Sequence, residues 1–411
     1  MRILVHDFAG YSFPVQLGRE LASRGHQVTQ VYPEGLPGPK GRLARSAEDP
    51  ELFRIEAIRL SSTFSKYSPV KRFLSQRTYA KDLKALIGKV QPDVVLSGDT
   101  PIDIQAELLW RCRRDGVRFV HWVQDVYYLA IHFFLQKQVG ALSPLLSFPF
   151  QLLEKQIARR SDANVVIAPA FGDLLGSWGV SASKINIIEN WAPLNEVASA
   201  KGNAGWSEAH GLAGKVVFLY SGTLGFKHRP DLIYKLAESL GDDCRVVVVT
   251  EGFGRNYLEG QPKRENLVLM DFQPYECLPE VLASADVLLA TLEADAGQFA
   301  VPSKILSYLC AGKPILFAAP EQNLAATVVK RSGAGFVTDP DIPETWTSAA
   351  QLLASDAELR QTLGRSAREY SERTFDISRI AAEFETVLAG VGAGVQGRNV
   401  REGDVPASVG S

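Results

Sequence analysis

Short apolar runs rich in valine, isoleucine and leucine alternate with helical stretches along almost the whole chain of 411 residues. Such runs are typical of strands buried on both faces of a parallel sheet, with the intervening helices covering it. The alternation predicts an α/β fold of doubly wound, Rossmann-like parallel sheets. We expect strands at Arg2–Val5, Gln27–Val31, Asp93–Leu96, Arg118–Val123, Ala163–Ile167, Ile185–Ile188, Val216–Tyr220, Arg245–Val249, Asn266–Leu269, Val287–Ala290 and Pro314–Phe317.

The segment 192–214 divides these strands into two groups. It is rich in proline, asparagine, alanine and glycine and has little periodicity, which indicates a linker. Two domains joined by a hinge are therefore expected, with ligands bound outside the carboxyl ends of the strands in a central cleft. The expected parts are domains at 1–192 and 214–372, a linker at 193–213, a final helix at 373–390 and a polar, disordered tail at 391–411.

Composition narrows the class of protein. Hydrophobic residues make up 46% of the chain and its formal net charge is −2, which excludes a chain that is disordered or fibrous throughout. The four cysteines lie far apart, so neither a zinc site nor a disulfide framework is implied, and a reducing cytoplasm fits best. We expect no signal peptide, since the apolar start is too short, and no nucleic-acid partner, since no long basic run is present.

Basic and aromatic residues gather in two stretches of the first half, where 24 Lys and Arg face 19 Asp and Glu. The stretches are Phe64–Lys84 and Phe133–Arg160. Their composition is typical of segments that lie at a membrane interface, although no apolar run reaches the roughly 18 residues that span a bilayer. The alternatives are solvated helix faces and aromatic residues of the core.

Two glycine turns follow consecutive strands of the second half. Tyr220–His228 lies between a strand and a helix that starts near Pro230, so its backbone amides and Lys227 can approach a phosphate. The alternative is an ordinary turn with a solvated lysine. Glu251 and Gly252 form the second turn.

A short apolar helix is expected after Pro302, ending at Gly312. Ser303 and Lys304 would lie in its first turn, where the helix dipole and the ammonium both favour anions. In the alternative, Lys304 only reaches out to solvent.

An ordered series of motifs resembles the retaining glycosyltransferases of family 4, and most closely those that build bacterial exopolysaccharide, capsule and colanic acid. The resemblance covers about residues 1–390. Its motifs are Gly10, Leu21–Val28, Ser161–Ala163, Ile187–Trp191, Tyr220–His228, Asp271–Pro279, Ala285–Leu289, Pro302–Lys304 and Gly312–Pro314.

The resemblance implies a GT-B fold with an N-terminal acceptor domain, a C-terminal nucleotide-sugar domain and a final helix that returns to the first. It implies transfer from a UDP- or GDP-linked sugar with retention, without a cofactor and without a bound metal. Lys227 matches the phosphate-binding lysine of the family, and Lys304 is placed to assist. The implied donor-binding residues are Gly222, Thr223, Gly225, Lys227, Glu251, Gly252, Gln273, Pro274, Tyr275, Pro302, Ser303, Lys304 and Ser307.

Two departures from the family pattern stand out. Phe299 and Ser307 occupy the positions of two family glutamates, and Ser307 would hold a ribose only by a neutral hydrogen bond of about 1 kcal/mol. Thr223 stands where many relatives have an arginine. Lys304 and backbone amides would then stabilise more of the leaving diphosphate.

The implied acceptor side consists of Gly10, Tyr11 and Asp125. Asp125 follows a strand where relatives have a histidine–aspartate pair or a lone aspartate, and its carboxylate would orient or deprotonate an acceptor hydroxyl. In the alternative it caps the next helix.

We therefore expect a cytoplasmic glycosyltransferase, peripheral on the inner face of the cell membrane, with a lipid-linked or glycan acceptor. Two rivals stay open. A GT-B sugar-nucleotide epimerase would act on the donor alone, and a non-catalytic pseudo-glycosyltransferase would explain the missing glutamates.

Overall fold

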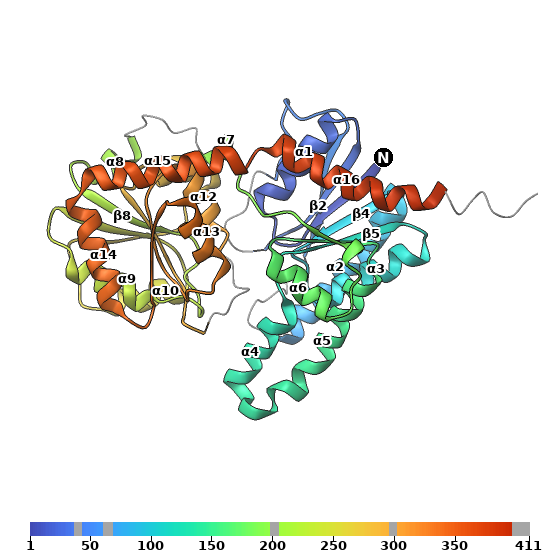
Figure 1. The fold of residues 1–411 in the computed structure, drawn as a ribbon, viewed down its shortest axis with the longest axis horizontal. Helices are drawn as coiled ribbons and strands as arrows, with labels where there is room; N and C mark the ends of the chain where they lie inside the picture. Colours follow the sequence, from blue (N-terminus) through green and yellow to red (C-terminus); the bar gives the residue numbers. More distant parts are fainter. Residues whose placement is uncertain (37–42, 61–68, 198–204, 296–301, 397–411) are drawn as a thin grey trace, which may run out of the picture. The chain divides into compact units, whose positions relative to one another are not determined.

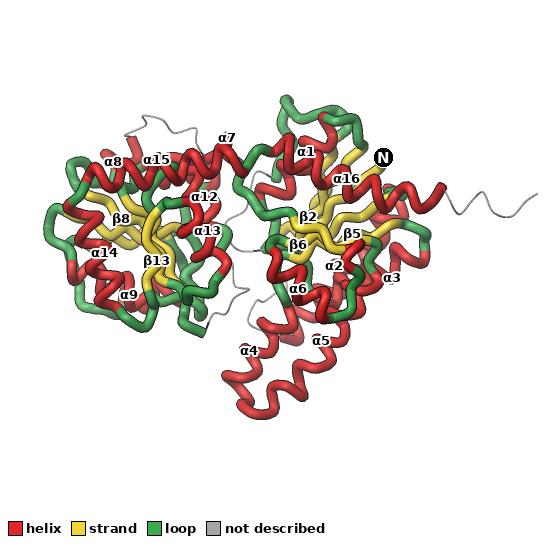
Figure 2. Tube along the Cα trace, viewed as in Figure 1, coloured by secondary structure: helices red, strands yellow, loops and turns green. Residues whose placement is uncertain are grey.

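The computed structural model describes residues 1–36, 43–60, 69–197, 205–295 and 302–396. They belong to two compact units. Of the described residues, 1–36, 43–60, 69–189 and 377–396 form the first unit, and 190–197, 205–295 and 302–376 form the second. Both are α/β, with the parallel sheets and covering helices that the apolar alternation predicts (Figures 1 and 2).

Within the described residues, the first unit holds a seven-stranded parallel sheet in the order β3-β2-β1-β4-β5-β6-β7. The order reverses direction at β1, which pairs with both β2 and β4, so the sheet is doubly wound. The strands are β1 (Arg2–Asp7), β2 (Gln27–Glu34), β3 (Phe53–Arg59), β4 (Val94–Gly98), β5 (Arg118–Val123), β6 (Ala163–Val166) and β7 (Ile185–Ile187).

Alternate residues of β5 show how helices cover both faces of this sheet. Phe119 belongs to a buried cluster with residues of α2 (Pro69–Val90) and α3 (Ile102–Arg114). Trp122, three residues on and therefore on the other face, packs edge-to-face against Phe13 of α1 (Ser12–Ser23) at a centroid distance of 5.5 Å. Helices therefore cover both faces of the sheet, as is usual for a parallel sheet.

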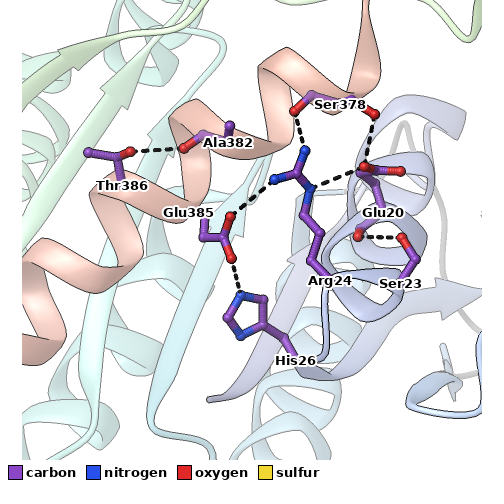
Figure 3. A network of polar contacts seen from close by, with 8 residues as sticks. All are labelled: Glu20, Ser23, Arg24, His26, Ser378, Ala382, Glu385 and Thr386. Atoms are coloured by element: carbon purple, nitrogen blue, oxygen red, sulfur yellow. Dashed lines mark hydrogen bonds and ion pairs between the residues drawn. The ribbon is translucent and has the colours of Figure 1, made fainter.

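The last helix, α16 (Ile377–Gln396), packs on the face that carries α1. The ring of Phe384 lies 4.8 Å from that of Trp122, and both side chains are fully buried. At the edge of this contact, Glu385 accepts hydrogen bonds from His26 Nε2 at 2.7 Å and from Arg24 Nη1 at 3.2 Å (Figure 3). The Phe384–Trp122 contact and the hydrogen bonds of Glu385, called here the polar clamp, thus fix α16 to the rest of the first unit.

A helical hairpin extends from the same unit (Figure 1). It consists of α4 (Tyr127–Val139), a short 3₁₀ turn at Gly140–Leu142 and α5 (Ser143–Arg160). Pro144 lies in the first turn of α5, where backbone N–H groups make no hydrogen bond within the helix, so its missing N–H costs nothing. Pro149 lies within the helix. The helix continues to Arg160, and its second half packs on α3.

Within the described residues, the second unit holds a six-stranded parallel sheet in the order β10-β9-β8-β11-β12-β13. Helices α9, α10 and α14 lie together on one face, and α11, α12, α13 and α15 lie together on the other. The strands are β8 (Val216–Ser221), β9 (Cys244–Val249), β10 (Leu267–Met270), β11 (Val287–Thr291), β12 (Ile315–Ala318) and β13 (Gly335–Thr338). The helices are α9 (Pro230–Ser239), α10 (Phe253–Glu259), α11 (Leu278–Ala283), α12 (Lys304–Ala311), α13 (Leu324–Ser332), α14 (Pro343–Ser355) and α15 (Ala357–Thr374).

Three expectations need correction. Each predicted strand is present, but β3 and β13 were not predicted; both are edge strands, less buried than their neighbours. The final helix starts at Ile377, within the expected range, but continues past residue 390 through its glycines to Gln396, because a helical glycine costs only about 1 kcal/mol. The segment expected as an irregular linker contains α7 (Leu194–Val197) and α8 (Gly205–Ala209). Residues 397–411 of the expected tail lie outside the described residues.

Candidate active site

The loop after β8 brings a glycine beside a lysine from another element of the second unit. Gly222 has a φ of 119°, in the region that favours glycine. A Cβ atom at this position would lie only 3.4 Å from the Nζ atom of Lys304, the first residue of α12. The loop and the first turn of α12 therefore meet as the sequence predicts, with no room to spare for a side chain.

The ammonium of Lys304 is buried and unpaired. Its Nζ atom lies 3.5 Å from the centroid of the Tyr220 ring and makes no hydrogen bond to any described residue. Burial lowers the pKa of Lys304 well below its usual value. The alternative in which this side chain merely reaches out to solvent is therefore wrong. A desolvated cation without a counter-ion is costly, so this point of the molecule favours an anion.

His228 lies beside two lysines. Burial, and then the charges of Lys304 and Lys227, lower the pKa of His228 to about 3, so its ring is neutral near pH 7. Its Nδ1 atom lies 3.1 Å from the amide nitrogen of Gly225 and 3.3 Å from the carbonyl oxygen of the same residue. Lys227 itself is exposed. The loop therefore carries the exposed cation of Lys227 and a neutral imidazole, and α12 adds the buried ammonium of Lys304 beside them.

Tyr308 holds the helix that carries Lys304 against the sheet. Its hydroxyl accepts a hydrogen bond from the amide of Ser221 at 3.1 Å and lies 3.2 Å from the carbonyl oxygen of Leu289, to which it can donate. Because Tyr308 is one helical turn after Lys304, these bonds fix the start of α12 relative to β8 and β11.

The other residues predicted on the donor side lie in the same unit, mostly after strand ends. Thr223 is exposed, and its carbonyl accepts the hydroxyl of Tyr220 at 2.7 Å. Glu251 is exposed. Gly252, the next residue, has a φ of 77° and is the N-cap of α10. Ser307 is half-buried on α12, whereas Phe299 lies outside the described residues.

The segment after β10 has contacts of its own. The side-chain amide of Gln273 donates to the carbonyl of Asp271 at 3.0 Å, and Pro274 precedes a 3₁₀ turn. The Tyr275 hydroxyl donates to Glu196 of α7 at 2.7 Å. Half-buried Pro302 and exposed Ser303 precede Lys304 directly.

Carboxylates gather at the carboxyl ends of the strands in the first unit. The amide of Tyr11 donates to the buried Asp7 at 2.8 Å, just after Gly10 with its φ of 74°. The charge of Asp99, then burial, and then the charges of Asp125 and Asp7 raise the pKa of Tyr11 well above its usual value. The structure thus brings Tyr11 and Asp125 together, as predicted, and adds Asp7 and Asp99.

The first two amides of α4 bond to a carboxylate of α5. Helix α4, which follows Asp125, starts at Tyr127, and no side chain of the preceding residue caps it. Instead, the carboxylate of Glu154 accepts the amides of Tyr127 at 2.9 Å and Tyr128 at 2.8 Å. Asp125 is exposed, and the capping role considered for it falls to a residue of α5.

The sequence interpretation missed five residues that shape these sites. Tyr220 and His228 are the two ends of the predicted loop but were given no role, and Tyr308 follows Lys304 by one turn. Asp7 is the last residue of β1, and Asp99 directly follows β4. Position at a strand's carboxyl end was a usable signal for the two aspartates. Within the described ranges, no three or more His, Cys, Asp or Glu side chains are grouped so that they could hold a metal ion.

Comparison with known families assigns both units. Residues 13–196 match the family model described as Glycosyltransferase Family 4, and residues 205–370 match that of Glycosyl transferases group 1. The chain belongs to the family 4-like glycosyltransferases. The enzyme class expected from the motifs is thereby confirmed. No curated protein matches the sequence.

Solved structures of low sequence identity share the GT-B fold of this glycosyltransferase. HepE of Anabaena, crystallised with UDP, has a TM-score of 0.66 at 15% identity, covering 95% of this chain and 100% of its own. HepE with UDP-glucose has a TM-score of 0.67 at 14% identity, with the same coverage. Sucrose-phosphate synthase of Thermosynechococcus elongatus has a TM-score of 0.69 at 16% identity, covering 96% and 100%. The predicted fold class is confirmed.

Proposed function

We propose that this glycosyltransferase moves a sugar from a nucleoside diphosphate sugar to a lipid-linked or glycan acceptor, in the synthesis of cell-envelope or extracellular polysaccharide. The observation that carries the proposal is the buried ammonium of Lys304 beside the glycine loop of β8, which has no hydrogen-bond partner among the described residues. A diphosphate is an anion that would neutralise it. HepE binds UDP and UDP-glucose, which supports a nucleotide-sugar donor here; UDP and GDP both remain candidates.

In this proposal the donor diphosphate lies between the β8 loop and the start of α12. Lys304 and the exposed Lys227 neutralise its charge, and the backbone around Gly222 and Gly225 approaches it closely. The remaining donor contacts would come from Thr223, Glu251, Gly252, Gln273, Pro274, Tyr275, Pro302, Ser303 and Ser307. With protein cations in this role, transfer proceeds without a metal, and the resemblance implies retention.

In the first unit, Asp125 and Tyr11 would face the acceptor, with Gly10 allowing a close approach of the backbone. The exposed carboxylate of Asp125 would orient or deprotonate the acceptor hydroxyl. The charges of Asp99, Asp125 and Asp7 all act on the neighbouring Tyr11, and the main role we assign to Asp125 is to position the acceptor hydroxyl.

A lipid-linked acceptor would place the enzyme on the cytoplasmic face of the cell membrane as a peripheral protein. No helix in the described part of the chain is long and apolar enough to cross a membrane. Of the two stretches predicted to contact the membrane, Phe64–Lys84 begins outside the described residues, whereas Phe133–Arg160 lies wholly within them.

The test is a transfer assay on the full chain with UDP- and GDP-linked sugars, with and without polyprenyl diphosphate sugars in detergent. We expect release of nucleoside diphosphate that requires the acceptor, together with a glycosylated lipid. A changed sugar formed without acceptor would identify an epimerase. Binding of nucleotides, seen as a rise in melting temperature, with neither product across the panel would identify the pseudo-enzyme. Lys304→Met serves as the inactive control.

A further inference from the structure

In the helical hairpin of α4 and α5, many apolar residues are exposed while polar residues are buried, the reverse of the usual arrangement. A helix of a water-soluble unit normally buries an apolar stripe and exposes polar residues. On the first half of α5, the buried residues are Ser143 and Ser147, and Glu154 follows them two turns later. Nine large apolar residues of the hairpin are exposed instead, with exposed fractions from 38% to 72%; they are Phe133, Phe134, Val139, Leu142, Leu145, Leu146, Phe148, Phe150 and Leu152.

Polar contacts join the two helices inside the hairpin. His132 Nδ1 lies 3.0 Å from the hydroxyl of Ser147. At the base, Glu154 of α5 accepts the first two amides of α4. None of the residues of α4 is fully buried. Polar groups that meet between helices while apolar groups face outward are characteristic of helices surrounded by lipid.

The apolar side chains cover more than one face of the hairpin. With about 100° per residue, Leu145 and Leu152 lie close to one line along α5, whereas Leu146 and Phe150 lie about 100° or more around the helix. A protein partner docked on one face would leave the other apolar side chains in water. An apolar medium that surrounds the end of the hairpin covers all of them.

The charge pattern agrees with a lipid surface. Residues 127–153 contain no aspartate or glutamate, and their only Lys or Arg is Lys137. More cations, Lys155, Arg159 and Arg160, follow toward the base of the hairpin. An apolar end followed by basic residues matches hydrocarbon capped by anionic headgroups.

We propose that the turn of the α4–α5 hairpin inserts into the interface of an anionic phospholipid bilayer and anchors the first unit there. The inserted part comprises the end of α4, the 3₁₀ turn and the first turns of α5. At about 1.5 Å per residue, this part is too short to span the bilayer, so insertion is shallow. The proposal rests on the proposed function, because it names the surface through which the enzyme reaches a lipid-linked acceptor.

The experiment uses the full chain and vesicles of phosphatidylglycerol and phosphatidylethanolamine. The hairpin variant Phe134→Gln/Leu145→Gln/Phe148→Gln removes three apolar groups that are 64%, 72% and 52% exposed and make few packing contacts. The control variant Ile342→Gln/Leu352→Gln removes two comparably exposed apolar groups from the second unit. Sedimentation with vesicles is measured at low and high salt, and nucleotide binding is followed by the rise in melting temperature.

We expect the parent and the control to sediment with vesicles and the hairpin variant to lose at least tenfold in vesicle affinity. Most of the parent's binding should persist at high salt, because apolar insertion is not screened. Equal binding by the hairpin variant, or no binding by the parent, would overturn the proposal. So would a parent dimer, measured without vesicles, that the hairpin variant dissociates. Nucleotide binding reports on the proposed function separately, since the hairpin lies in the other unit.

Discussion

The Nζ atom of Lys304 lies over the ring of Tyr220, 3.5 Å from its centroid, and this ring is its one polar or π contact among the described residues. A cation–π contact of a desolvated cation contributes about 2 kcal/mol, much less than removal of an ammonium from water costs. Within the described residues, the Lys304 ammonium therefore lacks the polar contacts that would offset its desolvation, and its charged form is strained. Binding of an anion relieves that strain, which is the basis of the first two predictions.

Replacing Lys304 should separate binding from stability. Lys304→Met removes a buried, unpaired charge, so we expect the melting temperature to stay level or rise while the transfer rate falls at least tenfold. Lys227→Ala removes an exposed cation and should have a smaller effect on nucleotide affinity. Calorimetric titration with UDP and GDP, together with initial rates, measures both. Parental transfer rates in both variants would show that the lysines do not bind the donor.

Nucleotide binding should take up a proton at alkaline pH. Burial lowers the pKa of the free Lys304, and a bound diphosphate would raise it again, so affinity should fall as pH rises through the lowered pKa. His228, with a pKa of about 3, stays neutral throughout and does not contribute. Titration in buffers of different ionisation enthalpy measures the proton count. A count of zero at every pH in the parent, equal to that of Lys304→Arg, would contradict the assignment.

Asp125→Asn tests the acceptor side. The substitution keeps the shape and removes the charge, so we expect transfer to fall about 100-fold while the donor dissociation constant is nearly unchanged. Asp173→Asn, a change on α6 (Pro169–Ser177) of the same unit, is the matched control. A loss below about threefold would exclude Asp125 from the mechanism and leave the departing phosphate as the base.

The two glycosyltransferase sheets were largely predictable because their central strands are buried on both faces and read as unbroken apolar runs. The edge strand β3 (Phe53–Arg59) has no such apolar run, since most of its residues are partly buried or exposed. Gly335–Thr338 is only four residues long and starts with a glycine packed against the neighbouring strand, where a Cβ atom would lie 1.8 Å from the Ile315 carbonyl oxygen. Its apolar signal is therefore weak.

Glu154 should give the first unit a distinctive pH dependence. Burial raises the pKa of Glu154 from 4.5 to about 7, despite the two amides it accepts. Between these values the folded state holds a proton that the unfolded state has lost, so the free energy of unfolding should fall as pH rises, by up to about 3 kcal/mol. Urea unfolding from pH 4.5 to 8 should show this decline in the parent and in Glu265→Gln, an exposed control, but not in Glu154→Gln. An identical pH profile for Glu154→Gln would contradict it.

The attachment of α16 should depend mainly on its apolar side. Phe384→Ala opens a cavity beside Trp122 and should cost about 3–5 kcal/mol. Glu385→Ala removes a partly exposed ion pair with Arg24 and a hydrogen bond with His26, and should cost about 1 kcal/mol. Hydrogen exchange of α16 amides measures both changes on the same element. A larger loss from Glu385→Ala would make the polar clamp the dominant contact.

The candidate site was predictable only in part. Lys227 and Lys304 stand in recognisable motifs, and position after a strand was enough to select Asp125. The burial of the Lys304 ammonium could not be predicted. It depends on the Tyr220 ring of β8 and on the Tyr308 hydroxyl that holds α12 to β8, and these groups meet only in the folded unit. The polar interior of the hairpin was not predicted for the same reason, because Ser147 and His132 form no recognisable pattern in the sequence and meet only when the two helices pack together.

Because α16 belongs to the first unit while α15 belongs to the second, the second unit is an insertion within the sequence of the first. During synthesis, the ribosome releases all of residues 190–376 before Phe384 can reach Trp122. The second unit is thus free to complete its core first, and the unit that starts the chain finishes last. Until then, the ring of Trp122 lacks the cover that Phe384 gives it, so the synthesis of α16, rather than of the sheet itself, sets the moment at which the first core closes.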